Sequence, residues 1–98
     1  MPETEYRSSR VCRILGNPTA YQVIKSLFKG KKTPGELAQE IGVSLTTMSD
    51  VLRHLRNIDI VRYEVKFNER IYWLKNPVVV EIILRLEKFV KCIRVQKW

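Results

Sequence analysis

The stretch ELAQEIGVSLTTMSDVLRHL, Glu36–Leu55, decides the fold of this chain, because it predicts two short helices separated by a break at Gly42–Ser44. Glycine accepts the left-handed conformation that ends a helix, and serine is a preferred N-cap for the next one. Just upstream, Thr33, Pro34 and Glu36 have the spacing of a capping box with proline at the first helical position. Two helices joined by a tight turn are therefore expected.

Each of these helices has one apolar face, because its large apolar residues recur at helical spacing. The second helix extends from a Ser44 cap to about Asn57, and its polar side chains lie opposite its apolar face. The apolar residues are Leu37, Ala38 and Ile41 in the first helix and Met48, Val51, Leu52, Leu55 and Ile58 in the second.

The residues before this pair predict two further helices. Apolar side chains have weak helical spacing in Tyr6–Leu15, and the segment GNP ends that helix. In residues 17–30, Pro18 stands at a helix start and Gly30 at the end, with an apolar face between them.

Residues 60–75 predict a β-hairpin, since the segments IVRYEVKF and RIYWLK are rich in β-branched and aromatic residues. Asn68 and Glu69 lie between the segments and are expected to form the turn. The chain is therefore expected to be mainly α with a small hairpin, in the order α-α-α-α-β-β-α.

A last helix is capped by Asn76 and opened by Pro77. Its apolar stripe is broader than the core of so small a domain needs, so pairing with a second copy is the simplest way to bury it. Residues 1–15 and 77–98 are therefore expected to form the interface of a homodimer. The expected interface residues are Val11, Leu15, Val79, Ile82, Ile83, Leu86, Phe89, Val90 and Ile93.

The composition indicates one domain over residues 1–98, with 45% hydrophobic residues and a formal net charge of +8. A basic surface favours a polyanionic partner such as nucleic acid. No apolar run approaches the roughly 20 residues of a membrane-spanning helix, and the polar start MPETEYRSSR does not resemble a secretory signal. A cytoplasmic location is expected, with no membrane partner.

The chain offers few groups for catalysis or metal binding. It has one histidine and two cysteines, Cys12 and Cys92, which stand far apart in the sequence. The thiols are either inert and buried, joined in a disulfide, or redox-active; the inert alternative is favoured because free cysteines are often buried. There is no pairing of nucleophile and base and no phosphate-binding glycine loop, so neither an enzyme nor a cofactor is expected.

Three blocks of the sequence also resemble a known family. LGNPTAYQVIKSLFKG, ELAQEIGVSLTTMSDVLRHLRNIDIV and RIYWLKNPVVVEII are similar to successive blocks of the ArsR/SmtB family of prokaryotic transcriptional repressors. The resemblance runs from Leu15 to Ile83 and implies a winged helix-turn-helix that binds operator DNA as a homodimer in the cytoplasm, associated with the nucleoid. Many family members release DNA when they bind a metal ion or when cysteines are oxidised.

The metal ligands of the family do not carry over to this chain. Sensors of arsenic, lead and cadmium have a Cys-x-Cys pair before the third helix, where this chain has Thr33 and Gly35. Zinc sensors place aspartate and histidine ligands on the last helix, and residues 77–98 contain neither. A metal is therefore not expected.

The resemblance implies that helix 44–57 enters the major groove of double-stranded DNA. Arg53 is the strongest candidate, since a guanidinium can bind guanine or a phosphate through two hydrogen bonds. Leu45 departs from the polar residue that family members often have at this position, and it could contact a thymine methyl group. The expected DNA-binding residues of this helix are Ser44, Leu45, Thr46, Thr47, Ser49, Asp50, Arg53, His54 and Asn57.

Residues outside this helix are expected to contact the DNA backbone or the minor groove. They are Lys31 and Lys32 in the loop before the third helix and Arg62, Lys66, Asn68 and Arg70 in hairpin 60–75, which forms the wing.

Asp50 places a negative charge on the face that should meet DNA. It can pair with Arg53 or His54 along the helix, or accept a hydrogen bond from cytosine. Two alternatives to a sequence-specific repressor stay open: a less specific basic or architectural nucleic-acid-binding protein, and a winged-helix adaptor that binds protein.

Overall fold

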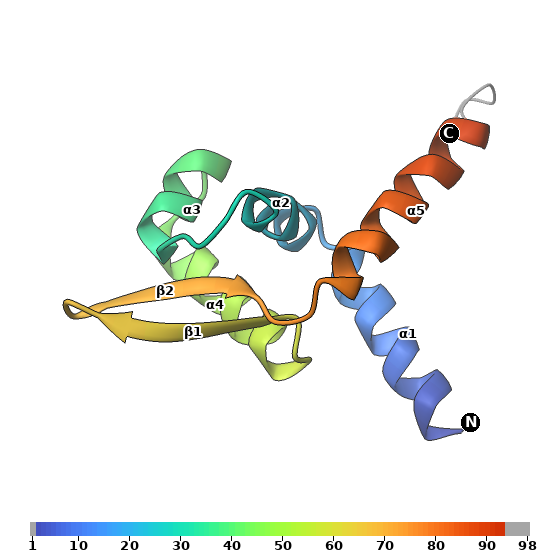
Figure 1. The fold of residues 1–98 in the computed structure, drawn as a ribbon, viewed down its shortest axis with the longest axis horizontal. Helices are drawn as coiled ribbons and strands as arrows, with labels where there is room; N and C mark the ends of the chain where they lie inside the picture. Colours follow the sequence, from blue (N-terminus) through green and yellow to red (C-terminus); the bar gives the residue numbers. More distant parts are fainter. Residues whose placement is uncertain (1, 94–98) are drawn as a thin grey trace.

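The computed structural model describes residues 2–93, which form five helices and one antiparallel hairpin (Figure 1). The expected order of four helices, a hairpin and a last helix is confirmed. The elements are α1 (Glu3–Leu15), α2 (Pro18–Leu27), α3 (Pro34–Ile41), α4 (Leu45–Asn57), β1 (Val61–Lys66), β2 (Glu69–Leu74) and α5 (Val78–Ile93).

The predicted signals between α3 and α4 are confirmed. Thr33 and Glu36 form the capping box, with each side chain accepting a hydrogen bond from the other residue's backbone N–H. Gly42 ends α3 in the left-handed conformation, with φ of 84°. Ser44 then caps α4 by accepting a hydrogen bond from the backbone N–H of Thr47 at 3.1 Å. The break between the helices is therefore as tight as the sequence predicted.

The core lies between α2, α3, α4 and the inner face of the hairpin. The hairpin is attached to the helices by the loop before α3, because Lys32 and Tyr72 exchange two backbone hydrogen bonds of 3.0 and 2.8 Å. The wing therefore has a fixed position beside α4. The buried apolar residues are Leu15, Ala20, Val23, Ile24, Leu27, Leu37, Ala38, Met48, Leu52, Leu55, Ile60, Val61, Tyr72, Val79 and Ile83.

The turn of the hairpin lies one residue earlier than predicted. Lys66 pairs with Glu69 across the strands, so the turn consists of Phe67 and Asn68 and not of Asn68 and Glu69. Both turn residues have positive φ, 52° and 63°, as the tight two-residue hairpin turns with φ above zero at both central positions require. The sequence prediction counted Phe67 as the last residue of the first strand, whereas the pairing of the oppositely charged Lys66 and Glu69 leaves it in the turn.

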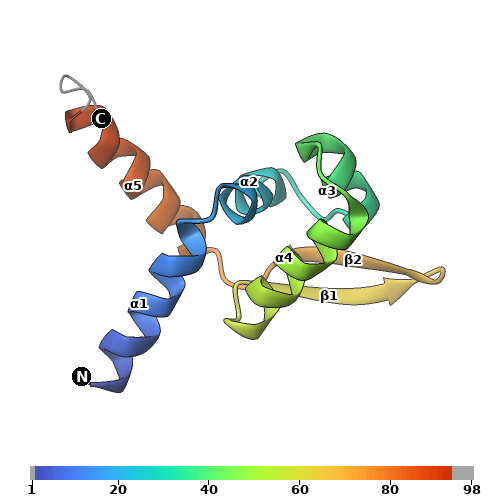
Figure 2. The same ribbon diagram turned by 180° about the vertical axis from the view of Figure 1, so that it is seen from behind.

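Helices α1 and α5 extend away from the body of the molecule on the side opposite the wing tip, and they diverge toward their ends (Figures 1 and 2). Three residues expected in the dimer interface, Leu15, Val79 and Ile83, are buried in the core of the single subunit. The expected interface is thereby reduced to the outer residues of both helices. Residues 94–98, part of that expectation, lie outside the described residues.

Glu87 anchors α5 to α2. Its carboxylate accepts hydrogen bonds from the Tyr21 hydroxyl at 2.7 Å and from the Lys25 ammonium at 2.9 Å. The Lys25 ammonium, followed by the Tyr21 hydroxyl, holds the pKa of Glu87 below its usual range. Partial burial, together with the Glu87 carboxylate, raises the pKa of Tyr21 to about 12. These bonds fix the direction of α5 relative to the helices of the body.

Glu87→Gln is expected to lower the free energy of unfolding by about 0.5 to 1 kcal/mol near neutral pH, because a neutral amide binds the ammonium less strongly at this partly exposed site. The pKa of Glu87 is lower in the folded chain than in the unfolded one. Its contribution is therefore complete near neutral pH and is lost as the pH falls through the folded-state pKa. Melting temperatures of wild type and variant, measured by circular dichroism at one protein concentration, should converge as the pH falls below the folded-state pKa of Glu87.

The matched control is Glu81→Gln, which makes the same change at an exposed position of the same helix. It removes only the weak interaction of a carboxylate with the N-terminus of α5, so its melting temperature should change less than that of Glu87→Gln. A Glu87→Gln variant that is as stable as the wild type at neutral pH would contradict the anchoring role.

Candidate nucleic-acid interface

Helix α4 presents the expected DNA-binding residues to solvent, because its opposite face is locked in the core. Met48, Leu52 and Leu55 are completely buried. At about 100° per residue, Thr46 and Asp50 point directly away from this buried face. All nine expected residues are exposed: Ser44, Leu45, Thr46, Thr47, Ser49, Asp50, Arg53, His54 and Asn57.

One flank of α4 faces the wing across an open groove that contains three guanidinium groups. Arg53 and Arg56 come from α4, and Arg70 comes from β2. The rest of the lining is a mixture of apolar and hydroxyl groups. We call this surface the arginine groove; it is lined by Pro34, Leu45, Ser49, Leu52, Arg53, Arg56, Arg70 and Tyr72.

Arg56 is a member of this groove that the sequence reasoning missed. It lies only about 80° from Met48 on the helical wheel, close to the apolar face, and was therefore left out of the predicted set. In the fold that direction leads to the hairpin, where the Tyr63 ring holds both Arg56 and Arg70, at 5.4 and 4.6 Å from the ring centroid. The Arg56 guanidinium also donates a hydrogen bond of 3.4 Å to the Tyr63 hydroxyl. Two of the three guanidiniums are thus positioned by one aromatic ring.

The other flank of α4 faces α1, and two expected DNA contacts lie there. His54 lines a groove with Arg10 and Arg13, and Asn57 lines a neighbouring groove that also includes Arg10. The helical wheel placed both residues on the same face as Arg53, but in the fold they line grooves shared with α1, apart from the arginine groove. Contact of His54 and Asn57 with DNA remains a prediction.

Asp50 pairs with Arg53, one of the two partners that the sequence allowed. The Asp50 carboxylate accepts a hydrogen bond from the Arg53 guanidinium at 3.0 Å. Both side chains are more than half exposed, so this ion pair adds little to the stability of the fold. Its effect is to hold the guanidinium of Arg53 on the outward face.

The acidic residues of α3 are used within the fold. Glu36 accepts a hydrogen bond from the Thr33 backbone N–H, which holds the pKa of that carboxyl below its usual range. Glu40 accepts a hydrogen bond of 2.7 Å from the Lys32 ammonium, which lowers the pKa of Glu40 in the same way. The negative charges of the helix pair are therefore partly neutralised away from the arginine groove.

The two lysines expected to bind phosphate differ in their surroundings. The Lys31 ammonium lies 4.7 Å from the centre of the Trp73 ring and 3.5 Å from a Glu64 oxygen, and its side chain is exposed. Lys32 is only 18% exposed and donates hydrogen bonds of 2.7 Å to Ser26 and Glu40. This geometry favours a structural role for Lys32 over the phosphate contact that the sequence predicted.

The four expected wing residues are exposed but point to different sides. Arg70 lies across from Val65 on the face of the hairpin that packs toward α4. Strand alternation places Arg62 and Lys66 on the opposite face, and Asn68 lies in the turn. Only Arg70 therefore shares a groove with α4.

The cysteines lie on separate helices, Cys12 on α1 and Cys92 on α5, and both thiols are free and exposed. The favoured expectation of two buried, inert thiols is therefore wrong as regards burial in the single subunit. Within residues 2–93, no group of three or more histidine, cysteine, aspartate or glutamate side chains is placed to hold a metal ion. Among the same residues, no helix has the length and apolar character needed to cross a membrane.

These elements define a winged helix-turn-helix domain, in which α3 and α4 are the helix-turn-helix and the β1–β2 hairpin is the wing. Residues 17–63 match the family model described as "Bacterial regulatory protein, arsR family". This segment, from the cap of α2 into β1, therefore belongs to the ArsR family of winged-helix DNA-binding transcriptional regulators. The resemblance seen in the sequence is confirmed. No curated protein is similar enough in sequence to match the chain.

Solved structures with the same fold cover nearly all of the chain. Rv0081 of Mycobacterium tuberculosis superimposes with a TM-score of 0.87 at 21% identity, covering 98% of this chain and 99% of that one. The homodimeric winged helix-turn-helix domain of Mb0332 from Mycobacterium bovis has a TM-score of 0.81 at 19% identity, covering 93% and 88%. The transcriptional repressor BigR from Xylella fastidiosa has a TM-score of 0.76 at 24% identity, covering 89% and 92%. These likenesses confirm the predicted fold.

Asp50→Ala is expected to raise the affinity for random duplex DNA about three- to tenfold, because one negative charge leaves the surface that faces the phosphates. It should also relax base preference, because Arg53 loses the partner that orients it. Dissociation constants for a selected duplex and for random duplexes, measured at one salt concentration, test both effects.

Asp50→Asn is the matched variant, since the amide keeps a hydrogen bond to Arg53 while the charge is removed. It should raise the affinity for random DNA but keep more of the discrimination. If Asp50→Ala discriminates between cognate and random duplexes as well as the wild type does, Asp50 has no part in reading bases.

Proposed function

We propose that the chain is a transcriptional repressor that binds a specific double-stranded DNA sequence as a homodimer. Helix α4 enters the major groove, and the hairpin lies along the flanking backbone as the wing. The observation that carries the proposal is the arginine groove, in which Arg53, Arg56 and Arg70 converge from two elements. A guanidinium cluster beside an exposed helix rich in hydroxyl and amide groups suits a duplex, since phosphates position the protein and base edges specify the site.

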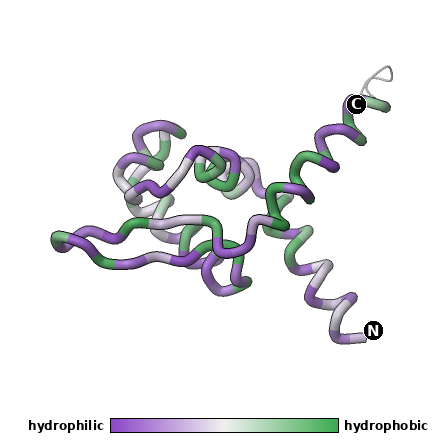
Figure 3. The backbone as a smooth tube through the Cα atoms, in the orientation of Figure 1, coloured by the Kyte–Doolittle hydropathy of each residue, from purple (hydrophilic) through white to green (hydrophobic). Residues whose placement is uncertain are grey.

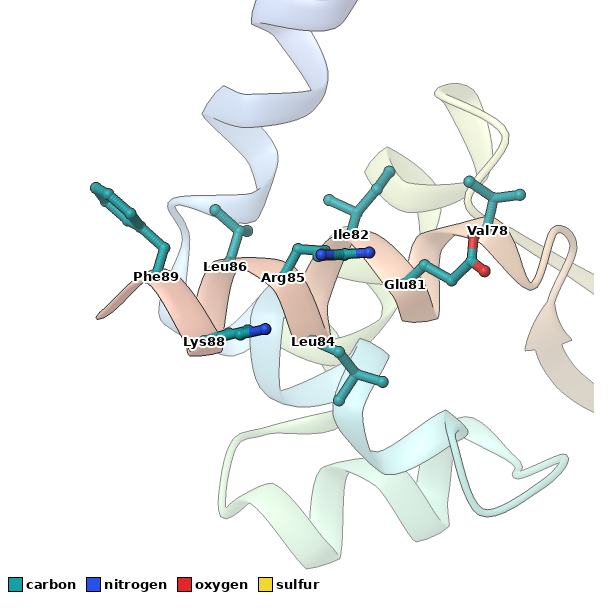
Figure 4. Close-up of a pocket in the computed structure, with 8 residues that line it drawn as sticks. All are labelled: Val78, Glu81, Ile82, Leu84, Arg85, Leu86, Lys88 and Phe89. Carbon is teal, nitrogen blue, oxygen red and sulfur yellow. The ribbon is translucent and has the colours of Figure 1, made fainter. Parts of the chain in front are cut away.

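Dimerisation is supported by the outer side of α5. Val78, Ile82, Leu86 and Phe89 project to the same side of this helix (Figure 4), and each of them is at least 40% exposed. An apolar stripe of this length on a small domain is typical of an interface between subunits. A two-fold dimer would bury the stripe against its own copy and present two α4 helices to one face of the DNA. The similar domain from Mycobacterium bovis is described as homodimeric.

Repression is the mode of action that requires the fewest additional interaction surfaces. A dimer bound to an operator blocks transcription by occupancy, for which a DNA-binding surface and a dimer surface are sufficient. Of the structures with this fold, BigR is described as a transcriptional repressor. A cytoplasmic protein associated with the nucleoid would be the consequence.

Selection of bound fragments from genomic or random DNA, followed by footprinting, tests the proposal. The expected result is a protected pseudo-palindrome whose half-site centres lie about one helical turn apart.

Arg56→Ala should weaken binding to every duplex and reduce the salt slope by about one, because a phosphate contact is lost. If the wild-type protein binds all duplexes with equal affinity, it is an architectural protein and not a sequence-specific repressor. No binding near physiological salt would indicate an adaptor for proteins.

Phe89→Glu is expected to convert the dimer into monomers, because it replaces the most exposed residue of the apolar stripe with a charged one. The affinity for the selected duplex should then fall by about a hundredfold or more, since one half-site contact is lost. Sedimentation velocity and gel-shift titration measure the two effects.

Leu84→Glu is the matched control for the dimer. Leu84 is an exposed apolar residue of the same helix that projects to the other side (Figure 4). This variant should remain dimeric and bind DNA normally. If Phe89→Glu is also a dimer at micromolar concentration, the interface lies elsewhere.

A further inference from the structure

The tip of the wing is an exposed phenylalanine in a conformation that phenylalanine disfavours. Phe67 is 98% exposed, and its φ is 52°. Among the described residues, the other non-glycine residues with positive φ are Asp59 and Asn68. Aspartate and asparagine tolerate this region well, whereas a bulky side chain there is an outlier.

Within residues 2–93, no contact accounts for an aromatic residue at this position. Glycine, asparagine and aspartate are the residues that suit a turn with positive φ, and Phe67 is none of them. The ring buries almost none of its surface, so packing does not offset the unfavourable backbone. Local conformation and hydration both act against phenylalanine, which points to a partner that the ring contacts.

The surroundings of the ring indicate the chemistry of that partner. Lys66 and Asn68 are its neighbours in the chain, and Glu69 and Arg70 follow on the other strand. The Lys66 ammonium lies 3.7 Å from a Glu64 oxygen, so both lysine and arginine side chains and carboxylates surround the ring. Figure 3 shows the tip of the hairpin as a hydrophobic point between hydrophilic stretches, at the end of the molecule farthest from α1 and α5. A single ring is too small a patch to hold a protein partner. An apolar side chain between cationic and amide groups matches the wedges that proteins insert between base steps in the minor groove of DNA.

We propose that Phe67 is such a wedge. When α4 occupies the major groove, the wing tip reaches the adjacent minor groove, and the ring enters between two base pairs and partly unstacks them. Lys66 and Arg70 contact the phosphates on either side. The operator would then have an easily unstacked step, such as TA or CA, at the position of the wing, and be read there through its deformability. This inference rests on the proposed function, because it needs a bound duplex.

Phe67→Asn tests the wedge, since asparagine suits the turn but cannot be inserted in the same way. The melting temperature should stay the same or rise by a few degrees, because the strained residue is gone. The affinity for the selected duplex should fall about tenfold. The dependence of affinity on salt should not change, because no charge is altered. Binding should also bend the duplex less, as measured by energy transfer between its labelled ends.

Two matched variants separate a wedge from a general effect of the wing. Lys66→Ala should reduce the salt slope by about one and leave the bend unchanged. Val65→Thr removes a second exposed apolar residue of the wing, which is 63% exposed. This variant should change neither the salt slope nor the bend of the duplex. The fluorescence of 2-aminopurine, placed at the base step that faces the wing, should increase when the wild-type protein binds and should not increase when Phe67→Asn binds.

These outcomes test the wedge separately from the proposed function on which it rests. A wild-type chain that binds no duplex overturns both. If the wild type binds a specific duplex and Phe67→Asn binds it equally well, the repressor proposal stands and the wedge is overturned. A loss of affinity with unchanged 2-aminopurine fluorescence and bending also overturns insertion.

Discussion

The burial of one face of α4 is the constraint on which the rest of this structure depends. Met48, Leu52 and Leu55 have no exposed surface, and they pack between α2, α3 and β1. This packing sets the rotation of α4 about its own axis, so the polar half of the helix has only one direction in which to point. Removing any of these side chains would cost about 2 to 5 kcal/mol, a large part of the stability of so small a domain. The direction of the polar face of α4, which we propose binds DNA, is therefore a consequence of the core.

The distribution of charge follows from the same packing. Along the sequence, residues 31–59 carry as many acidic as basic side chains, which argues against a DNA-reading helix pair. In space, the carboxylates of α3 are satisfied by Thr33 and Lys32, whereas the guanidiniums of α4 face the wing. A neutral segment thus provides a cationic groove, because the fold orients its opposite charges differently.

The exposed apolar residues are as informative as the buried ones. The residues of the stripe on α5 and the ring of Phe67 are exposed, and none of them belongs to the buried core. A small domain cannot leave such surfaces exposed without a cost in solubility. We propose a second copy of the chain as the partner of the stripe and a nucleic acid as the partner of the ring.

The sequence by itself determined the elements and their order, since these depend on local signals: the Thr33 capping box, the left-handed Gly42 and the Ser44 cap each act within a few residues. It also determined which face of α4 is apolar, and hence the exposed residues that include Arg53 and Asp50.

Only the tertiary structure decided which exposed residues share a surface. Arg56 joined Arg70 because the Tyr63 ring contacts both, whereas His54 lines a groove with α1 and Arg53 lines the arginine groove. Strand pairing placed Phe67 in the turn, and the ammonium of Lys32 was turned inward by Ser26 and Glu40. Helix periodicity describes one element at a time, whereas a binding surface is made by neighbours that are distant in sequence.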